Sequence, residues 1–377
     1  MDYSVIENYL SRVAESRVYD APVWKSAQGG APAISYLDGG MLAALYSLYR
    51  RTGDKKYLNY LDGYFDFYVG DDGAIVGYNQ ENCDIRDVGQ GRALFDLYRE
   101  TGKIKYKKAI DLLYNQLLRQ QRTDFGNFCN NKTYPLQVTL EGLYAAMPFY
   151  TRYESEFNRG RNYADIVKQL RNIYAYAYDS YKKLYHSGWD TSNTAFWCDP
   201  ETGLSKAFLL RSTGWYLAAL ADTISYFDMS APDLKAELIT IFRKSAEGLE
   251  QYIDAAKNTL CQVPDRNGEE GNFSETSGNL LIAYALMKGA RLGYTDRRFA
   301  EIGKNVFNAV CGEYLSETED GNLQLDGISI ADLPVADDDR RKDGTYEYYV
   351  CEPLVKNDAL GIVPLVLAYS EIKTLKK

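Results

Sequence analysis

The strongest constraint on the fold is a helix-ending motif that occurs twice. Residues 48–57 read Leu-Tyr-Arg-Arg-Thr-Gly-Asp-Lys-Lys-Tyr, and residues 97–106 read Leu-Tyr-Arg-Glu-Thr-Gly-Lys-Ile-Lys-Tyr. In both, a glycine follows a periodic helix and a lysine-containing segment opens the next helix, which is a common way for a helix to stop. Arg291-Leu292-Gly293-Tyr294 forms a third such corner. Repetition of this kind predicts a repeated pair of helices.

The hydrophobic pattern extends this unit over the whole chain. It predicts helices at 3–17, 36–52, 54–69, 89–101, 103–121, 136–153, 161–184, 206–227, 232–257, 275–292, 296–312 and 358–373. The best candidates for strands are 74–78 and 322–330. Every second helix is mostly apolar, whereas the helices between them carry charged residues on one side. We therefore predict an all-α fold, a single (α/α)6 barrel of six helix pairs spanning residues 1–377.

Composition excludes several partners. The net charge is −9 and no basic stripe is present, so we expect no nucleic-acid binding. No stretch approaches the ~20 apolar residues that a membrane span needs. The first residues show no signal peptide and the six cysteines are widely spaced, which predicts a cytoplasmic protein with free thiols. The single histidine excludes a histidine-rich zinc site. We expect a monomer or a small homo-oligomer.

Glu141 is the most informative single acid. It lies near the first turn of the apolar helix 136–153. Burial raises the pKa of such a carboxyl, whereas the helix N-terminus favours its charged form. This balance can place its titration near neutral pH, as a general acid/base requires. The alternative is that Glu141 only stabilises the helix end.

The segments before the inner helices collect the rare residues of the chain. All four tryptophans and the only histidine lie there: Trp24, His186, Trp189, Trp197 and Trp215. Carboxylates, an arginine, aromatic planes and glycines at one end of a barrel are typical of a sugar site. The long linker 312–357, rich in Asp and Gly, is a further candidate for a functional rim.

A series of motifs along the chain carries a resemblance to a known family. They are Gly91-Arg92-Ala93-Leu94-Phe95-Asp96, Leu140-Glu141-Gly142-Leu143-Tyr144, His186 with Trp189-Asp190, Asp199-Pro200-Glu201-Thr202-Gly203, Arg211 with Gly214-Trp215-Tyr216, Glu275-Thr276-Ser277-Gly278, Gly344-Thr345-Tyr346-Glu347 and Asn357-Asp358-Ala359-Leu360-Gly361. In this order they resemble glycoside hydrolase family 105, the unsaturated rhamnogalacturonyl (glucuronyl/galacturonyl) hydrolases, and more distantly family 88.

The resemblance implies hydration of a vinyl ether. The substrates are oligosaccharides left by polysaccharide lyases, which end in a 4,5-unsaturated uronic acid. An acid protonates C4, water adds at C5, and the resulting hemiketal opens to release the saccharide. This chemistry needs one proton-transferring carboxylate, a donor for the substrate carboxylate and stacking surfaces. It requires no metal and no organic cofactor.

The resemblance also assigns residues, with several departures. Glu141 stands where the family has its general acid/base, normally Asp. Asp84 and Asp87 compete for the position of a second family Asp, and Arg86 is a third candidate for the aligned position. Asn130 replaces a family His and Thr213 a family Asn.

Three positions match the family pattern: His186, Arg211 and Trp215. Arg211, with Lys356 nearby, is the expected partner of the substrate carboxylate. The alternatives are a structural role for His186 and a surface ion pair for Arg211, although the apolar neighbours of Arg211 disfavour the second.

Two functions therefore stay open. The first is a hydrolase of unsaturated uronic-acid oligosaccharides in which Glu141 substitutes for Asp. The second is a drifted relative that binds saccharides or acts on a different glycoside.

Overall fold

Thirteen α-helices dominate the residues that the computed structural model describes, which are 2–25, 33–333 and 340–375. The helices are α1 (Ser4–Glu15), α2 (Tyr36–Thr52), α3 (Lys55–Tyr68), α4 (Leu94–Thr101), α5 (Ile104–Arg119), α6 (Leu140–Phe157), α7 (Tyr163–Tyr176), α8 (Leu210–Tyr226), α9 (Pro232–Glu250), α10 (Thr276–Arg291), α11 (Arg298–Tyr314), α12 (Tyr346–Cys351) and α13 (Ala359–Leu375). Eight strands of two or three residues form four antiparallel pairs: β1 (Gln137–Thr139) with β4 (Gly188–Asp190), β2 (Tyr178–Asp179) with β3 (Leu184–Tyr185), β5 (Leu315–Glu317) with β6 (Leu323–Leu325), and β7 (Ile328–Ser329) with β8 (Leu354–Val355).

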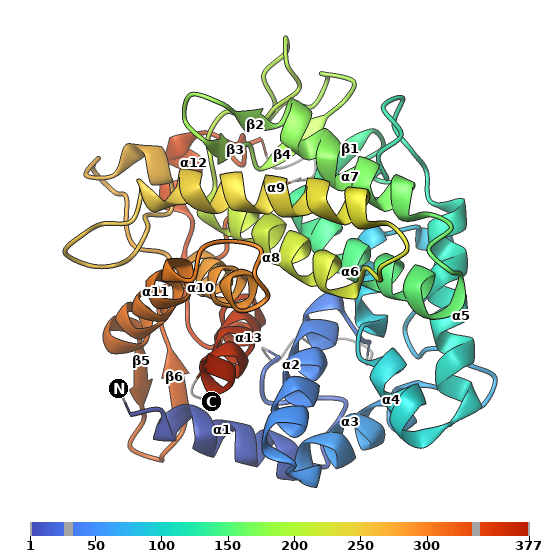
Figure 1. The fold of residues 1–377 in the computed structure, drawn as a ribbon. Helices are drawn as coiled ribbons and strands as arrows, with labels where there is room; N and C mark the ends of the chain where they lie inside the picture. Colours follow the sequence, from blue (N-terminus) through green and yellow to red (C-terminus); the bar gives the residue numbers. More distant parts are fainter. Residues whose placement is uncertain (1, 26–32, 334–339, 376–377) are drawn as a thin grey trace.

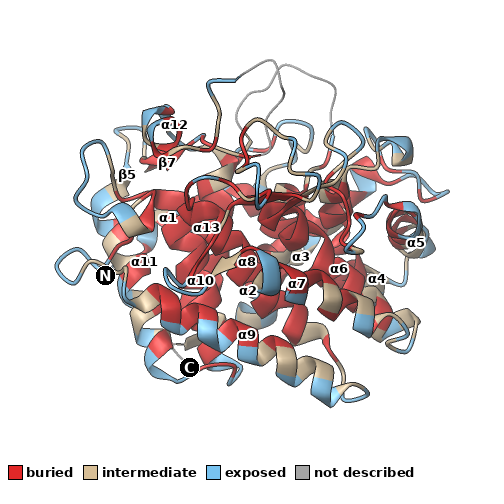
Figure 2. Ribbon diagram, turned by 90° about the horizontal axis from the view of Figure 1, so that it is seen from above, coloured by how far each residue is buried: buried red, intermediate tan, exposed pale blue. Residues whose placement is uncertain are grey.

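The inner helices form a closed ring. Helix α2 packs on α13, α13 on α10, α10 on α8 and α8 on α6. Helix α6 then packs on the 3-10 segment η2 (Ile85–Gly91), which leads into α4, and η2 contacts α2 again. Helices α1, α3, α5, α7, α9 and α11 lie outside this ring (Figure 1). The buried residues gather on the inner helices, and the exposed ones on outward faces and loops (Figure 2). The predicted (α/α)6 barrel is thereby confirmed.

The predicted glycine stops are confirmed as well. Gly53 and Gly102 follow α2 and α4 with φ of 74° and 68°, the left-handed conformation that glycine adopts without steric cost. At the other end of α2, the Ser35 hydroxyl accepts from the Asp38 backbone N–H, and the Asp38 carboxylate accepts from the Ser35 backbone N–H. This reciprocal cap fixes where the first inner helix begins.

The second inner helix differs from its predicted range of 89–101. Its first part is the 3-10 segment η2, and the α-helix starts only at Leu94. The glycines in η2 permit very close packing, since a Cβ on Gly89 would lie 2.7 Å from the Tyr36 Cβ, and one on Gly91 would lie 2.5 Å from the Leu113 Cδ1. Contacts with other helices, rather than local propensity, therefore set the backbone here.

Other predicted ranges were too long. The helix predicted at 161–184 ends at Tyr176 and gives way to the β2–β3 hairpin, and the one at 232–257 ends at Glu250. The stretch 74–78 contributes only an isolated bridge between Val69 and Ile75, whereas 322–330 contains β6 and β7. The linker 312–357 also carries α12, and its residues 334–339 lie outside the described part. None of the described helices is both long and apolar enough to cross a membrane.

Candidate active site

Glu141 lies in the first turn of α6, at the end of the barrel where the inner helices begin. The Thr139 hydroxyl caps this helix by accepting from the Gly142 backbone N–H at 3.1 Å. The strand just before it, β1, pairs with β4, so that Val138 lies opposite Trp189. The carboxylate is thus carried by a capped helix on a paired strand, which limits its freedom to move.

The surroundings of Glu141 hold the pKa of its carboxyl near neutral pH. The side chain is buried, and the Tyr36 hydroxyl donates to its Oε1. Arg86 Nη1 lies 3.8 Å from Oε2. Burial raises the pKa of Glu141 and the nearby charge of Asp332 adds to this, whereas Arg86, Tyr36 and Arg211 lower it; the result is a pKa of about 7. A carboxyl with this pKa can both donate and accept a proton near pH 7.

Asp84 is tied to Arg86 rather than to Glu141. Arg86 donates from Nε at 3.0 Å and from Nη2 at 2.8 Å to the two oxygens of Asp84, and Asn131 adds a third bond at 3.1 Å. Burial raises the pKa of Asp84, but the bonds and charge of Arg86 outweigh it, so the pKa lies below its usual value. Asp84 is therefore a permanent anion that orients Arg86 towards Glu141.

Asp87 has the opposite character. Burial and the neighbouring charge of Asp84 raise the pKa of Asp87 to about 6, with Arg86 opposing them. Of the two predicted candidates for a second acid, Asp87 is thus the one that titrates and Asp84 the one linked to Glu141 through Arg86.

A second carboxylate approaches Glu141 from the linker. Asp332 is half-buried, and its pKa is raised by burial despite the nearby charges of Arg211 and Arg86. Arg211 holds this segment in place, since its two terminal nitrogens donate to the backbone carbonyls of Ser329 and Ala331. Arg211 is itself buried and approaches Glu275, which caps α10, at 4.0 Å.

Aromatic rings form a column beside Glu141. The Trp215 ring lies 5.9 Å from Tyr36, edge to face, and 4.4 Å from Tyr144. Trp215 is buried, and its indole Nε1 has no hydrogen-bond partner among the described residues. The same holds for the Thr213 hydroxyl one half-turn earlier in α8. Buried donors without partners at a site suggest a role in binding a ligand or water.

The remaining predicted residues lie elsewhere around this end. Asn130 is buried and accepts from the Thr139 hydroxyl at 3.0 Å, so it supports the cap of α6. His186 Nδ1 lies 2.5 Å from the Ser205 carbonyl and its ring packs on Phe208. Burial lowers the pKa of His186. Lys356 is exposed and pairs with Asp326 at 3.1 Å.

Two residues that contact or influence Glu141 were not predicted. Tyr36 opens the predicted helix 36–52, but the sequence gives no sign that its hydroxyl meets a residue on another helix. Asp332 lies in the linker 312–357, so the prediction of a functional rim pointed to its region and not to the residue. Among the described residues, no group of three or more His, Cys, Asp or Glu is arranged to hold a metal.

The ring of paired helices with carboxylates at one mouth is that of an (α/α)6-barrel glycoside hydrolase, and the known relatives agree. The sequence profile of Glycosyl Hydrolase Family 88 matches residues 7–376. A family 105 glycoside hydrolase of C. acetobutylicum ATCC 824 is 33% identical, with a TM-score of 0.89 over 99% of this chain and 100% of its own. The chain therefore belongs to this group of glycoside hydrolases, families 88 and 105.

Other relatives extend the comparison. Protein Atu3128 of Agrobacterium fabrum is 34% identical over 235 residues, which are 60% of this chain and 97% of that protein. The unsaturated glucuronyl hydrolase of Bacillus sp. GL1, responsible for the degradation of glycosaminoglycan, has a TM-score of 0.65 over 90% of this chain and 86% of its own. At 12% identity it shares the fold alone.

Proposed function

We propose that this protein removes the terminal 4,5-unsaturated uronic acid from lyase-generated oligosaccharides by hydrating the C4=C5 bond. The observation that carries the proposal is the buried Glu141, whose pKa of about 7 suits a group that gives up a proton and takes one back. Membership of families 88 and 105 supports an oligosaccharide as the substrate.

In the proposed reaction, Glu141 transfers its proton to C4 and positive charge develops at C5 and the ring oxygen. Water then adds at C5 and loses a proton to the Glu141 carboxylate, which restores the starting state. The C5 hemiketal then opens: its C5–O5 ring bond breaks, the C5 hydroxyl proton moves to O5, and a C5 ketone and a C1 hemiacetal result. The hemiacetal collapses to an aldehyde, the C1–O bond to the saccharide breaks, and the hemiacetal proton passes to the departing oxygen, so the shortened saccharide leaves with a free hydroxyl. One water is consumed and the enzyme is unchanged.

Charged groups around Glu141 support the remaining roles. Arg86 and Arg211 are the cations whose charges lower the pKa of Glu141, and either can bind the substrate carboxylate. The bond from Arg86 to Asp84 and those from Arg211 to backbone carbonyls fix both guanidinium groups before substrate arrives. Tyr36 and Trp215 pack edge to face beside Glu141 and form the apolar wall of the proposed site.

A second candidate rests on the carboxylates themselves. Glu141 and Asp332 interact electrostatically across the site, and ordinary glycosidases use two carboxylates, one as acid and one as base or nucleophile. A protein that hydrolyses saturated glycosides, or only binds saccharides, is thus the alternative to vinyl-ether hydration.

Loss of ultraviolet absorbance distinguishes these functions. Pectin, ulvan and glycosaminoglycans are digested with lyases, and the absorbance of the C=C bond is followed after the protein is added. We expect the absorbance to fall with at least one digest. We expect no release of free sugar from matched saturated glycosides. Hydrolysis of saturated glycosides with stable C=C absorbance would favour the second candidate, and binding without either reaction would leave a saccharide-binding protein.

A further inference from the structure

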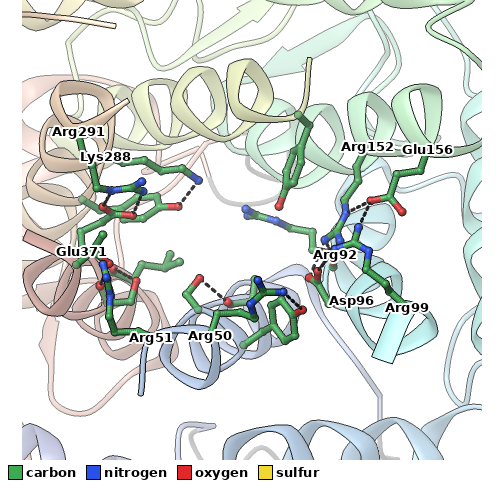
Figure 3. Close-up of a pocket in the computed structure, with 18 residues that line it drawn as sticks. Arg50, Arg51, Arg92, Asp96, Arg99, Arg152, Glu156, Lys288, Arg291 and Glu371 are labelled. Atoms are coloured by element: carbon green, nitrogen blue, oxygen red, sulfur yellow. Dashed lines mark hydrogen bonds and ion pairs between the residues drawn. The ribbon is translucent and has the colours of Figure 1, made fainter. Parts of the chain in front are cut away.

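A cavity opens at the opposite end of the barrel from Glu141. Along α6, Arg152 lies three turns, about 16 Å, beyond Glu141. The cavity has a volume of about 500 Å³ and lies between the C-terminal halves of inner helices (Figure 3). Its charged lining residues are Arg50, Arg51, Arg92, Asp96, Arg99, Arg152, Glu156, Lys288, Arg291 and Glu371. Seven of these are cations and three are carboxylates, in a protein whose net charge is −9.

Helix dipoles and ion pairs explain part of this charge. Five of the cations lie in the last turns of α2, α4 and α10, where a positive charge stabilises the helix end. Arg152 donates to both Asp96 and Glu156, and Arg291 forms two bonds with Glu371 at 2.7 and 2.8 Å. These contacts engage all three lining carboxylates.

Arg92 is explained only in part, by an ion pair with Asp222 and by the Tyr144 ring, whose centroid lies 4.7 Å from its guanidinium carbon. It precedes α4, so it is not at a helix C-terminus, and its side chain is only 4% exposed. One terminal nitrogen donates to Asp222, which also accepts from Lys288 at 2.6 Å and Tyr284 at 2.5 Å. Its Nε and Nη1 have no hydrogen-bond partner among the described residues. Figure 3 shows the guanidinium reaching into the middle of the cavity.

Leaving a buried guanidinium with two unbonded nitrogens is costly, so this arrangement suits an anionic acceptor that completes it. The other cations surround that position from several sides: Arg50 and Arg51 from α2, Arg99 and Arg152 from α4 and α6, and Lys288 and Arg291 from α10 (Figure 3). A tetrahedral dianion accepts hydrogen bonds from several directions at once, whereas a single carboxylate satisfies one planar fork.

We propose that this cavity is an anion-binding site for a phosphate or sulfate group, either free or carried by a small sugar-sized molecule. The group contacts Arg92 at the centre of the cavity and Arg50 and Arg99 at its rim. The site is separate from the Glu141 mouth and does not depend on the reaction proposed there.

Isothermal titration calorimetry of the 377-residue chain in a chloride buffer of low ionic strength tests this proposal. The probes are inorganic phosphate, sulfate, glucose 6-phosphate, glucuronate and glucose. We expect phosphate or sulfate to bind at millimolar concentration or below, with glucuronate and glucose much weaker. If glucose 6-phosphate binds more tightly than inorganic phosphate, the natural ligand carries its phosphate on a small molecule. If the two bind equally, the ligand is the free ion. No binding of any dianion, or glucuronate binding as well as phosphate, would overturn the proposal.

Variants place the binding in this cavity. Arg92→Gln removes the central donor, and the double variant Arg50→Gln/Arg99→Gln removes two exposed cations without touching the core. Each should weaken dianion binding at least about tenfold. Arg298→Gln is the matched control, because Arg298 is as exposed as Arg99 and also pairs with a glutamate, but lies outside the cavity. Unchanged affinity in the double variant, or an equal loss in the control, would contradict the assignment.

Discussion

At the scale of single residues, the candidate site depends on how one carboxyl is tuned. Burial and the charge of Asp332 raise the pKa of Glu141, and Arg86, Tyr36 and Arg211 hold it at about 7 rather than higher. Protonation of C4 needs the acid form, so kcat/KM should fall as pH rises through this pKa. Glutamate in place of the aspartate of the family pattern is compatible with this role if the neighbours position its longer side chain.

The Asp332→Asn variant tests the tuning. Removing the negative charge near Glu141 lowers the Glu141 pKa, because the ionised form of Glu141 no longer meets a like charge. We therefore expect the alkaline limb of the pH profile of kcat/KM to move to lower pH. Asp320→Asn, an exposed change in the same linker, should leave the profile unchanged. A shift to higher pH, or none, would contradict the proposed interaction.

Arg211→Lys tests the cation that holds the linker. Lysine lacks the planar fork, so one of the carbonyls of Ser329 and Ala331 loses its buried donor. We expect the free energy of unfolding to fall by about 1–3 kcal/mol and KM for unsaturated oligosaccharides to rise. Chemical denaturation and steady-state kinetics measure both, with the exposed Arg298→Lys as the control. If stability and KM both match the parent protein, Arg211 has neither role.

At the scale of elements, close packing of η2 connects the fold to the site. Gly89 lies against Tyr36, whose hydroxyl donates to Glu141, and a Cβ there would also come within 3.1 Å of Ala145 in α6. Two inner elements therefore approach closely just where the catalytic candidate is carried.

Gly89→Ala should disturb both packing and chemistry. The added methyl overpacks the contact, and we expect a loss of about 1–3 kcal/mol in the free energy of unfolding. Displacement of Tyr36 should also lower kcat in the protein that remains folded. Thr240→Ala on the exposed side of α9 is the control and should change neither quantity. Parent-like stability would show that the contact has room to relax.

The helix list was predictable because its signals are local. Glycine stops such as Gly53 and the alternation of apolar and charged helices depend on residues a few positions apart. The replacement of the first turns of 89–101 by η2 was not predictable, since contacts of Gly89 and Gly91 with other helices produce it.

The same division applies to the site. Glu141 was recognisable from its place at the start of an apolar helix. Tyr36 lies 105 positions before Glu141 in the sequence, and Asp332 lies about 190 positions after it. No local sequence pattern encodes contacts over such separations.

At the scale of the whole molecule, the inner ring closes between α13 and α2, near the two ends of the chain. Each inner helix is buried between two others, so no pair of helices has a separate core. We propose that residues 1–377 form one domain, and we expect a single cooperative unfolding transition. Calorimetric and van't Hoff enthalpies should then agree. Two resolved transitions, or a stable fragment after limited proteolysis, would indicate two domains.

The central claim is that Glu141 supplies the proton that starts hydration of the C4=C5 bond. The most direct test compares the rate of absorbance loss for the parent protein and Glu141→Gln on the same lyase-generated oligosaccharide at neutral pH. Glutamine keeps the size and hydrogen bonding but has no proton to transfer, so turnover should fall about 10²–10⁴-fold while saccharide binding changes little. Glu141→Asp should retain measurable turnover, because it keeps the carboxyl. Parent-like turnover in Glu141→Gln would contradict the account and leave Asp87 or Asp332 as the acid.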